Sequence, residues 1–138
     1  MANSKPVMGI NDVPMWDSMA RGQLELQCCG ECAAFRYPPA PVCPECLSEQ
    51  YRWKAVSGRG NILSWVVFHR KYFDDHPPPY NSVAVRLDEG PIVVSQLHGA
   101  EPAGSWIGQP VRLGYGEHAG RIQHHVVLDN GDTDGAPR

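Results

Sequence analysis

The hydrophobic and polar positions from Tyr51 onward form a series of short runs. Each run is rich in Val, Ile, Leu or aromatic residues, and turn-favouring residues such as glycine, proline, asparagine or aspartate separate the runs. Apolar runs of this length, bounded by turn signals, predict strands rather than helices. The predicted strands span residues 52–57, 62–70, 82–87, 92–98, 111–115 and 122–128.

The connections between these runs indicate how the strands pair. Parallel neighbours need long crossover connections, which are usually helical. The long connection at residues 71–81 contains the run Pro77-Pro78-Pro79 and shows no helical pattern. We therefore expect a mainly β protein with a small antiparallel barrel of the OB type. A β-sandwich is the alternative, but it would be undersized.

The N-terminal part predicts one short helix. Asn11 or Asp12 can cap it, Pro14 suits its first turn, and Gly22 ends it. Because so short a helix is not stable alone, we expect it to pack against the rest of the chain. Its predicted packing face carries apolar residues at helical spacing: Val13, Trp16 and Ala20.

Composition limits the chain to one ordinary domain, or to a small module joined to a minimal one. The chain has 138 residues, 42% hydrophobic and 20% charged, as in folded globular proteins. Its formal net charge of −3 does not favour nucleic acid as a partner. Residues 1–8 lack the apolar stretch of a secretory signal, and no segment approaches the ~20 apolar residues of a membrane span. We expect a cytoplasmic protein without a membrane partner.

The strongest chemical signal is a pair of Cys-x-x-Cys motifs. Two residues between cysteines let a tight turn direct both sulfurs at one ion, and a second motif completes the tetrahedron that Zn²⁺ accepts. Four thiolates leave no coordination position for water or substrate, so the motifs predict a structural zinc ribbon rather than a catalytic centre. The expected ligands are Cys29, Cys32, Cys43 and Cys46.

Other interpretations of the cysteines stay open at this level. Iron in a rubredoxin-like site uses the same ligands, and a cluster without metal is a further alternative. A redox-active Cys-x-x-Cys pair would be expected in a βαβ unit, and the hydrophobic pattern of this sequence predicts no such unit. A reducing compartment and the odd count of five cysteines both disfavour disulfides. The fifth thiol, Cys28, is expected to face away from the ion on the preceding strand.

An ordered series of short motifs points to one family. The motifs are Leu-Gln-Cys-Cys-Gly-Glu-Cys at 26–32, Arg-Tyr-Pro-Pro at 36–39, Val-Cys-Pro-Glu-Cys at 42–46, Ser-Gly-Arg-Gly at 57–60, Leu-Asp-Glu-Gly-Pro at 87–91 and Ile-Gly-Gln-Pro-Val at 107–111. With them the chain resembles the acyl-CoA-associated family catalogued as domain of unknown function number thirty-five. Two positions depart from the family pattern. Cys28 replaces a frequent basic residue, and Ala33 stands where a knuckle usually has glycine, which adopts positive φ most easily.

The resemblance implies a domain order. It places a helical segment at 1–25, a rubredoxin-like zinc ribbon at 26–50 and an OB-fold at 51–128. We expect the tail at 129–138 to be disordered because, after Asp129, it has no apolar residue large enough to anchor it.

The resemblance also implies a function. Proteins of this type are accessory subunits of thiolase-fold acyl-CoA enzymes, including aldolases of steroid side-chain degradation, so we expect a hetero-oligomer in which the partner performs the chemistry. The expected contact with the partner, or with the phosphates of acyl-CoA, mixes aromatic anchors with basic side chains. Its residues are Phe68, His69, Arg70, Lys71, Tyr72, Phe73 and Tyr80.

Two further hypotheses belong to other classes. OB barrels and zinc ribbons also bind nucleic acids, although a net negative charge works against a basic groove. The other hypothesis is that the chain is a free-standing enzyme or acyl-CoA-binding protein. Catalysis by the chain alone is the weaker hypothesis, because the sequence contains no nucleophile elbow, P-loop or dinucleotide fingerprint, and we assign no catalytic residue. The consecutive pair His124-His125 is not expected to bind a metal, since neighbouring side chains on a strand point to opposite faces.

Overall fold

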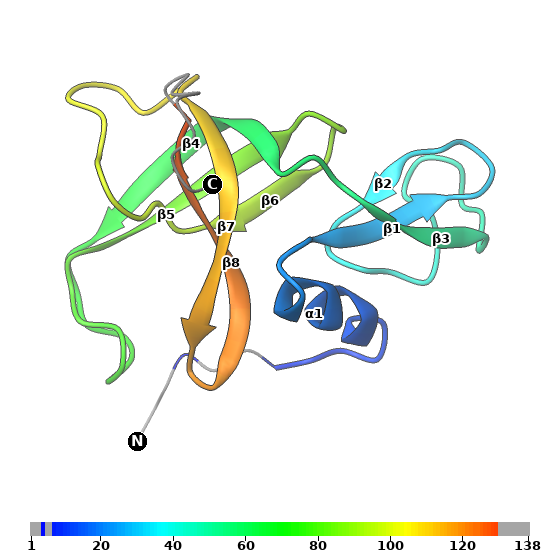
Figure 1. The fold of residues 1–138 in the computed structure, drawn as a ribbon, viewed down its shortest axis with the longest axis horizontal. Helices are drawn as coiled ribbons and strands as arrows, with labels where there is room; N and C mark the ends of the chain where they lie inside the picture. Colours follow the sequence, from blue (N-terminus) through cyan, green and yellow to red (C-terminus); the bar gives the residue numbers. More distant parts are fainter. Residues whose placement is uncertain (1–3, 5–6, 130–138) are drawn as a thin grey trace.

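The computed structural model describes residue 4 and residues 7–129. Within that part, one short helix accompanies two antiparallel sheets, so the protein is mainly β as predicted. Figure 1 shows a small sheet beside a larger, curved one, with the helix below the small sheet and next to β8. The elements are α1 (Val13–Ala20), β1 (Glu25–Cys29), β2 (Phe35–Arg36), β3 (Tyr51–Ala55), β4 (Arg59–Phe68), β5 (Tyr80–Leu87), β6 (Ile92–Ser95), β7 (Pro110–His118) and β8 (Arg121–Leu128).

The smaller sheet has the strand order β2-β1-β3. Its central strand β1 is largely buried, and Gln27 stands opposite Arg36 on one side and opposite Trp53 on the other. The run predicted at 52–57 is thus present as β3, but it pairs with β1. It completes the ribbon sheet, whereas the other predicted runs form the larger sheet.

The larger sheet has the order β6-β5-β4-β7-β8 and closes almost completely into a barrel. Closure depends on Val126, whose N–H donates to Gln96 O and whose carbonyl accepts from His98 N–H, both at 2.9 Å. The β4–β5 register shifts between Ile62 and Ser64, which bends the long strand β4. At Gly60 a Cβ atom would lie 2.3 Å from Arg86 O, so only glycine fits where the two strands approach.

One core joins the barrel to the helix and the ribbon. On β5 the inward-facing Val83, Val85 and Leu87 are buried, as period-two alternation requires. Met15 and Met19 from α1 belong to the same cluster, as does Leu26 from β1. Because the core is continuous, the ribbon and the barrel are packed on each other and not merely tethered.

The helix is present where predicted, but its predicted face is wrong. Met15, Ser18 and Met19 are buried, while Val13 and Ala20 are exposed and Trp16 is half-buried. The physical reason is Ser18, whose Oγ donates to Met15 O at 2.6 Å and accepts from Glu25 N–H at 2.9 Å, which turns this side of α1 towards β1.

Two sequence predictions concern the ends of the chain and the membrane. Apart from Asp129, the tail predicted to be disordered lies outside the described residues. Within those residues, no helix has the length and apolar character needed to cross a membrane.

Candidate metal centre and partner surface

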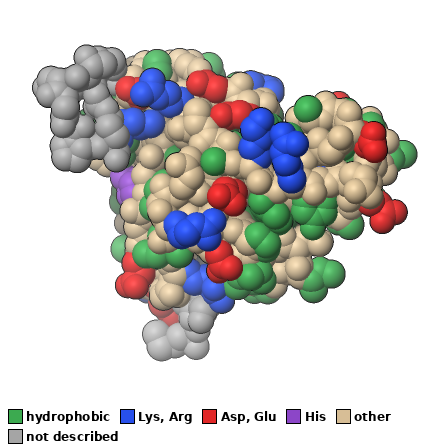
Figure 2. Space-filling model, turned by 45° about the vertical axis from the view of Figure 1, so that its right-hand side comes forward, with side chains coloured by type: hydrophobic (Ala, Val, Ile, Leu, Met, Phe, Trp, Pro, Cys, Tyr) green, Lys and Arg blue, Asp and Glu red, His purple; other side chains and the backbone are tan. Residues whose placement is uncertain are grey.

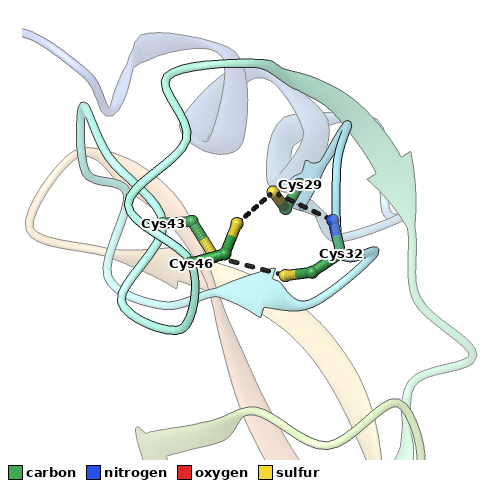
Figure 3. Close-up of side chains that lie close together, drawn as sticks. All are labelled: Cys29, Cys32, Cys43 and Cys46. Carbon is green, nitrogen blue, oxygen red and sulfur yellow. Dashed lines mark hydrogen bonds between the residues drawn. The ribbon is translucent and has the colours of Figure 1, made fainter.

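Two turns bring four cysteine sulfurs together at the tip of the ribbon. Cys29 ends β1, Cys32 follows in the next turn, and the second motif lies in the loop between β2 and β3. The four Sγ atoms lie within 4.8 Å of one another. Cys29 and Cys46 approach to 3.6 Å, as do Cys32 and Cys43. Figure 3 shows the four side chains converging from the two turns on one point.

The two turns are built alike. In the first, Ala33 N–H donates to Cys29 O at 3.1 Å; in the second, Leu47 N–H donates to Cys43 O at 2.9 Å. Both turns end in a residue of positive φ, 65° at Ala33 and 66° at Leu47. The departure from glycine at position 33 therefore leaves the left-handed turn in place, at the cost of a backbone conformation that side chains disfavour.

Backbone N–H groups prepare the sulfurs for negative charge. Glu31 N–H and Cys32 N–H donate to Cys29 Sγ at 3.4 and 3.5 Å, and Glu45 N–H donates to Cys43 Sγ at 3.4 Å. The N–H groups of Cys32 and Glu31 lower the pKa of Cys29 to about 6. For Cys43, burial raises the pKa, but the N–H groups of Cys46 and Glu45 outweigh it and lower the pKa overall.

The other two thiols behave in the opposite way. The N–H of Ala34 lowers the pKa of Cys32, but burial and hydrogen bonding to the other three cysteines, Cys43 foremost, together outweigh it and raise the pKa to about 12. The pKa of Cys46 is also raised, against the lowering effect of the Ser48 N–H, by burial and its hydrogen bond to Cys29. Each close pair therefore joins one thiol with a lowered pKa to one with a raised pKa, and a divalent cation among the four sulfurs would favour the deprotonated form of all of them.

The donor set fits zinc. Four sulfurs arranged around one point match the tetrahedral coordination of Zn²⁺ by thiolates, and they fill it, so that no position is left for water or substrate. The fifth thiol does not join them. Cys28 is buried, and its Sγ lies 3.5 Å from Ala33 O, outside the group of four.

A buried arginine supports the loop that carries the second motif, and sequence reasoning missed it. Arg36 is 1% exposed, and its guanidinium donates to the carbonyls of Ala40, Ser48 and Gln50 at 3.1–3.2 Å. Beside it on β1, Gln27 Oε1 accepts from Ala40 N–H at 2.7 Å. The sequence signal for this role is faint: a lone arginine in a short strand followed by a proline-rich loop.

The structure gathers the predicted partner surface at one end of the barrel. Phe68 ends β4 and stacks on Tyr80, which begins β5, with ring centroids 4.9 Å apart. Tyr72 meets the edge of Phe68 at 6.0 Å, and the guanidinium of Arg70 lies 5.5 Å from the centroid of the Tyr72 ring.

The remaining predicted residues lie in the loop and are exposed. His69 and Phe73 face solvent, the latter with 38% of its surface accessible, and Tyr72 is 53% exposed. Lys71 Nζ lies 3.4 Å from Asp74 Oδ1, so part of the predicted basic character is balanced within the loop.

Comparisons with known proteins agree with this architecture. The model of the ChsH2 rubredoxin-like zinc ribbon domain matches residues 16–52, which contain all four clustered cysteines, and the model of the ChsH2 C-terminal OB-fold domain matches residues 53–115. A solved structure entitled "Ltp2-ChsH2(DUF35) aldolase" superposes with a TM-score of 0.80 at 27% identity, covering 90% of this chain and 98% of that one. A DUF35-family protein of unknown function from Sulfolobus solfataricus, 10% identical with a TM-score of 0.63, shares the fold; this match covers 88% of our chain and 87% of that one.

Three curated relatives show the same family in other settings. A probable enoyl-CoA hydratase alpha subunit of Thermomonospora curvata is 31% identical over 79% of this chain, and the 3-oxo-4,17-pregnadiene-20-carboxyl-CoA hydratase alpha subunit of Mycobacterium tuberculosis is 33% identical over 72%. A DUF35 domain-containing scaffold protein of Pyrococcus furiosus is 33% identical over 48%. The chain spans 34%, 32% and 49% of these relatives. With the two domain models adjoining and covering most of its length, the chain belongs to the ChsH2-type (DUF35) family, which joins a structural zinc ribbon to an OB-fold.

Proposed function

We propose that this chain is a non-catalytic accessory subunit that binds and stabilises a thiolase-fold acyl-CoA enzyme. The observation that carries the proposal is the match to the Ltp2-ChsH2(DUF35) aldolase, whose title names two components and whose matched chain is covered almost completely. The names of the relatives support it, because two are alpha subunits of acyl-CoA hydratases and one is a scaffold. The proposal includes a hetero-oligomer, acting in the cytoplasm on a steroid or another acyl-CoA side chain.

The metal centre supports a scaffolding role. We propose Cys29, Cys32, Cys43 and Cys46 as the four zinc ligands, since their sulfurs converge within 4.8 Å. A thiolate-filled ion offers no open position for a substrate and supplies folding energy instead. The ribbon would then hold its loops in a fixed shape for the partner.

We propose the exposed aromatic loop as the contact with the partner or with its acyl-CoA. Tyr72 and Phe73 present accessible rings beside the stacked pair Phe68 and Tyr80. Aromatic rings held in place by their neighbours, next to an arginine, have the composition of interface hot spots. Arg70 contacts the Tyr72 ring and remains free of a carboxylate within the described residues, so it can pair with an acidic group or a phosphate.

Co-expression tests the proposal. The chain is produced with and without the thiolase-fold protein encoded nearest to it, and the products are examined by size-exclusion chromatography with light scattering and by aldolase assay. We expect one complex and a partner that is soluble and active only with this chain. A chain that purifies alone and leaves the enzyme's solubility and activity unchanged would contradict the proposal.

A paired variant locates the contact. Tyr72→Ser combined with Phe73→Ser should weaken the complex at least tenfold, a loss of about 1.4 kcal/mol or more, as expected for hot-spot residues. The matched control is Ile107→Ser, which removes an exposed apolar side chain, 61% accessible, from the loop before β7. If both variants weakened binding of the partner equally, the assignment of the contact to this loop would be wrong.

The two alternative functions have distinct outcomes. Figure 2 shows, on the face it presents, Lys and Arg side chains interspersed with acidic ones rather than joined in a continuous stripe, and the net charge is −3. Salt-dependent binding of single-stranded nucleic acid by the chain alone would nevertheless establish that function. Calorimetric binding of an acyl-CoA to the isolated chain would favour a free-standing acyl-CoA-binding protein.

A further inference from the structure

A cavity of about 500 Å³ lies at the end of the barrel where β4 stops and β5 begins. The β7–β8 hairpin and the residues after β6 form its other walls, so segments far apart in the sequence share it. Its volume falls within the range of roughly 300–1,000 Å³ that small-molecule sites occupy. The metal centre and the exposed rings of Tyr72 and Phe73 lie outside its lining, whereas Phe68 and Tyr80 of the predicted partner surface belong to it.

The lining gathers histidines. The chain has six histidines, and all but His69 line this cavity. They come from four places: the loop before β5, the residues after β6, the end of β7 and the middle of β8. The five are His76, His98, His118, His124 and His125.

Burial disfavours the charged form of four of the five cavity histidines. Burial lowers the pKa of His76, His98 and His125, and burial together with the neighbouring His125 lowers that of His124 to about 4. No lysine or arginine is among the described lining residues, and the acidic one, Glu117, is exposed. An anionic ligand would therefore leave water without gaining a cation, and a cationic ligand would find a carboxylate only where solvent already reaches it.

The walls offer flat aromatic surfaces and hydrogen-bonding groups that are incompletely used. The rings of His98 and His125 stack at 4.2 Å, and His76 meets Tyr80 edge-on at 4.1 Å. Between them, the side-chain amide of Gln96 reaches His76 Nε2 and His98 Nε2 only at 3.4 Å, longer than the usual ~2.9–3.0 Å. A neutral imidazole either donates or accepts at a given nitrogen, so these groups suit a ligand hydroxyl or carbonyl.

We propose that this cavity binds an uncharged small molecule with a flat apolar frame and one hydroxyl or carbonyl group. The aromatic walls would cover the frame, and Gln96 with the imidazoles beside it would hold the oxygen. The inference rests on the cavity alone and holds whether or not the chain assembles with a partner enzyme.

Three probes with one ring system test the class of ligand: 2-naphthol, 2-naphthoate and 2-naphthylmethylammonium. Each is titrated into the full chain at pH 7.5, followed by calorimetry and by the imidazole carbon-bound proton resonances. We expect 2-naphthol to bind at least tenfold more tightly than either ion and to shift cavity histidine resonances while leaving His69 in place. Binding of an ion as tight as or tighter than that of 2-naphthol, shifts confined to His69, or no binding of any probe would overturn the proposal.

A substitution tests the polar anchor. Gln96→Leu keeps the shape of the wall but removes the amide, and should weaken 2-naphthol binding about tenfold while leaving binding of unsubstituted naphthalene within about twofold. Gln50→Leu, the same change at an exposed position outside the cavity, is the matched control and should change neither. If thermal unfolding shows that Gln96→Leu disturbs the fold, the resonance shifts in the unsubstituted chain still decide between the outcomes.

Discussion

Arg36 Nη2 donates to the carbonyl oxygen of Ser48 at 3.2 Å, and the same oxygen accepts from the N–H of Cys43 at 2.9 Å. One carbonyl thus joins a buried cation to the backbone of a cysteine in the metal cluster. Since Arg36 also donates to the carbonyls of Ala40 and Gln50, one side chain contacts the segment between β2 and β3 at three points.

Replacing Arg36 by methionine should destabilise the ribbon by about 3 kcal/mol. Methionine fills a similar volume but removes three hydrogen bonds from a charged donor. The carbonyls of Ser48 and Gln50 keep the backbone N–H groups of Cys43 and Gly30 as donors, whereas the Ala40 carbonyl loses the donor that Arg36 supplies. Denaturant unfolding of the zinc-loaded chain measures the loss. Arg52→Met on the exposed face of β3 is the control and should stay within about 0.5 kcal/mol; similar losses in both variants would show that the carbonyl contacts of Arg36 are unimportant.

Cys43→Ser and Cys28→Ser should have different effects on zinc. Cys43 belongs to the group of four sulfurs, and Cys28, although buried, does not. Since structural zinc binding is folding energy, Cys43→Ser should lose zinc and cost about 3 kcal/mol or more. Cys28→Ser should keep one zinc per chain by elemental analysis. Equal zinc loss in the two variants would show that the ligand assignment is wrong.

Glycine at the end of either cysteine turn should stabilise the protein. Ala33 and Leu47 both have positive φ, which costs an L-residue roughly 1–2 kcal/mol, partly offset by glycine's greater freedom in the unfolded chain. We expect Ala33→Gly to add about 0.5–1 kcal/mol to the free energy of unfolding. Ala34→Gly, at a position without positive φ, should lower it instead. A stabilising Ala34→Gly would mean that chain flexibility, not backbone strain, governs this turn.

Two glycines on β7 should respond differently to a methyl group. A Cβ atom at Gly114 would lie 2.6 Å from His125 Nε2, whereas at Gly116 the nearest atom of the same ring would be 3.7 Å away. Gly114→Ala should therefore displace the His125 ring from its stack on His98 and cost about 1–3 kcal/mol, as overpacking does. Gly116→Ala should be nearly neutral. The imidazole resonances and thermal unfolding together measure both effects, and equal shifts would contradict the packing seen around His125.

Stability should fall in mild acid because of His124. Its pKa is lowered to about 4 by burial and by the neighbouring His125, whereas the unfolded chain titrates near ~6.5. Below about pH 6.5 the unfolded state binds more protons, so stability is lost as pH falls towards the folded value, by about 2–3 kcal/mol at pH 4. His124→Gln should flatten this part of the profile of unfolding free energy against pH. An unchanged slope would assign the acid sensitivity to other groups.

Local sequence patterns predicted where the helix and strands lie, and tertiary contacts determined which faces are buried and which strands pair. Residue spacing alone identified the cysteine turns, because ligand geometry is set within a few residues. The helix offered two apolar stripes, and a hydrogen bond from Glu25 N–H to Ser18 Oγ, which periodicity does not encode, selected the one with Met15 and Met19. The sheet that β3 joins likewise depended on its pairing with β1, a contact across the intervening loop.

Buried polar groups were the least predictable features. A lone arginine gives no sign that it will donate to three carbonyls, since its partners come from elsewhere in the chain. The histidine cavity is even harder to predict from the sequence, because its lining residues come separately from β6, β7 and β8. His124 and His125 both border the cavity, but their neighbours differ: His124 pairs with Ser95, and His125 stacks on His98.

The strand β1 connects two distant points of the molecule. Just before it, Leu24 N–H donates to the hydroxyl of Tyr115 on β7 at 2.8 Å, and its last residue is Cys29 of the metal cluster. Five extended residues span about 17 Å, and β1 is flanked by strands on both sides. The pairing on both sides keeps β1 extended, so β1 fixes the distance between the metal cluster and the barrel. A protein that binds at the tip of the ribbon would therefore be held at a defined distance and angle from the barrel.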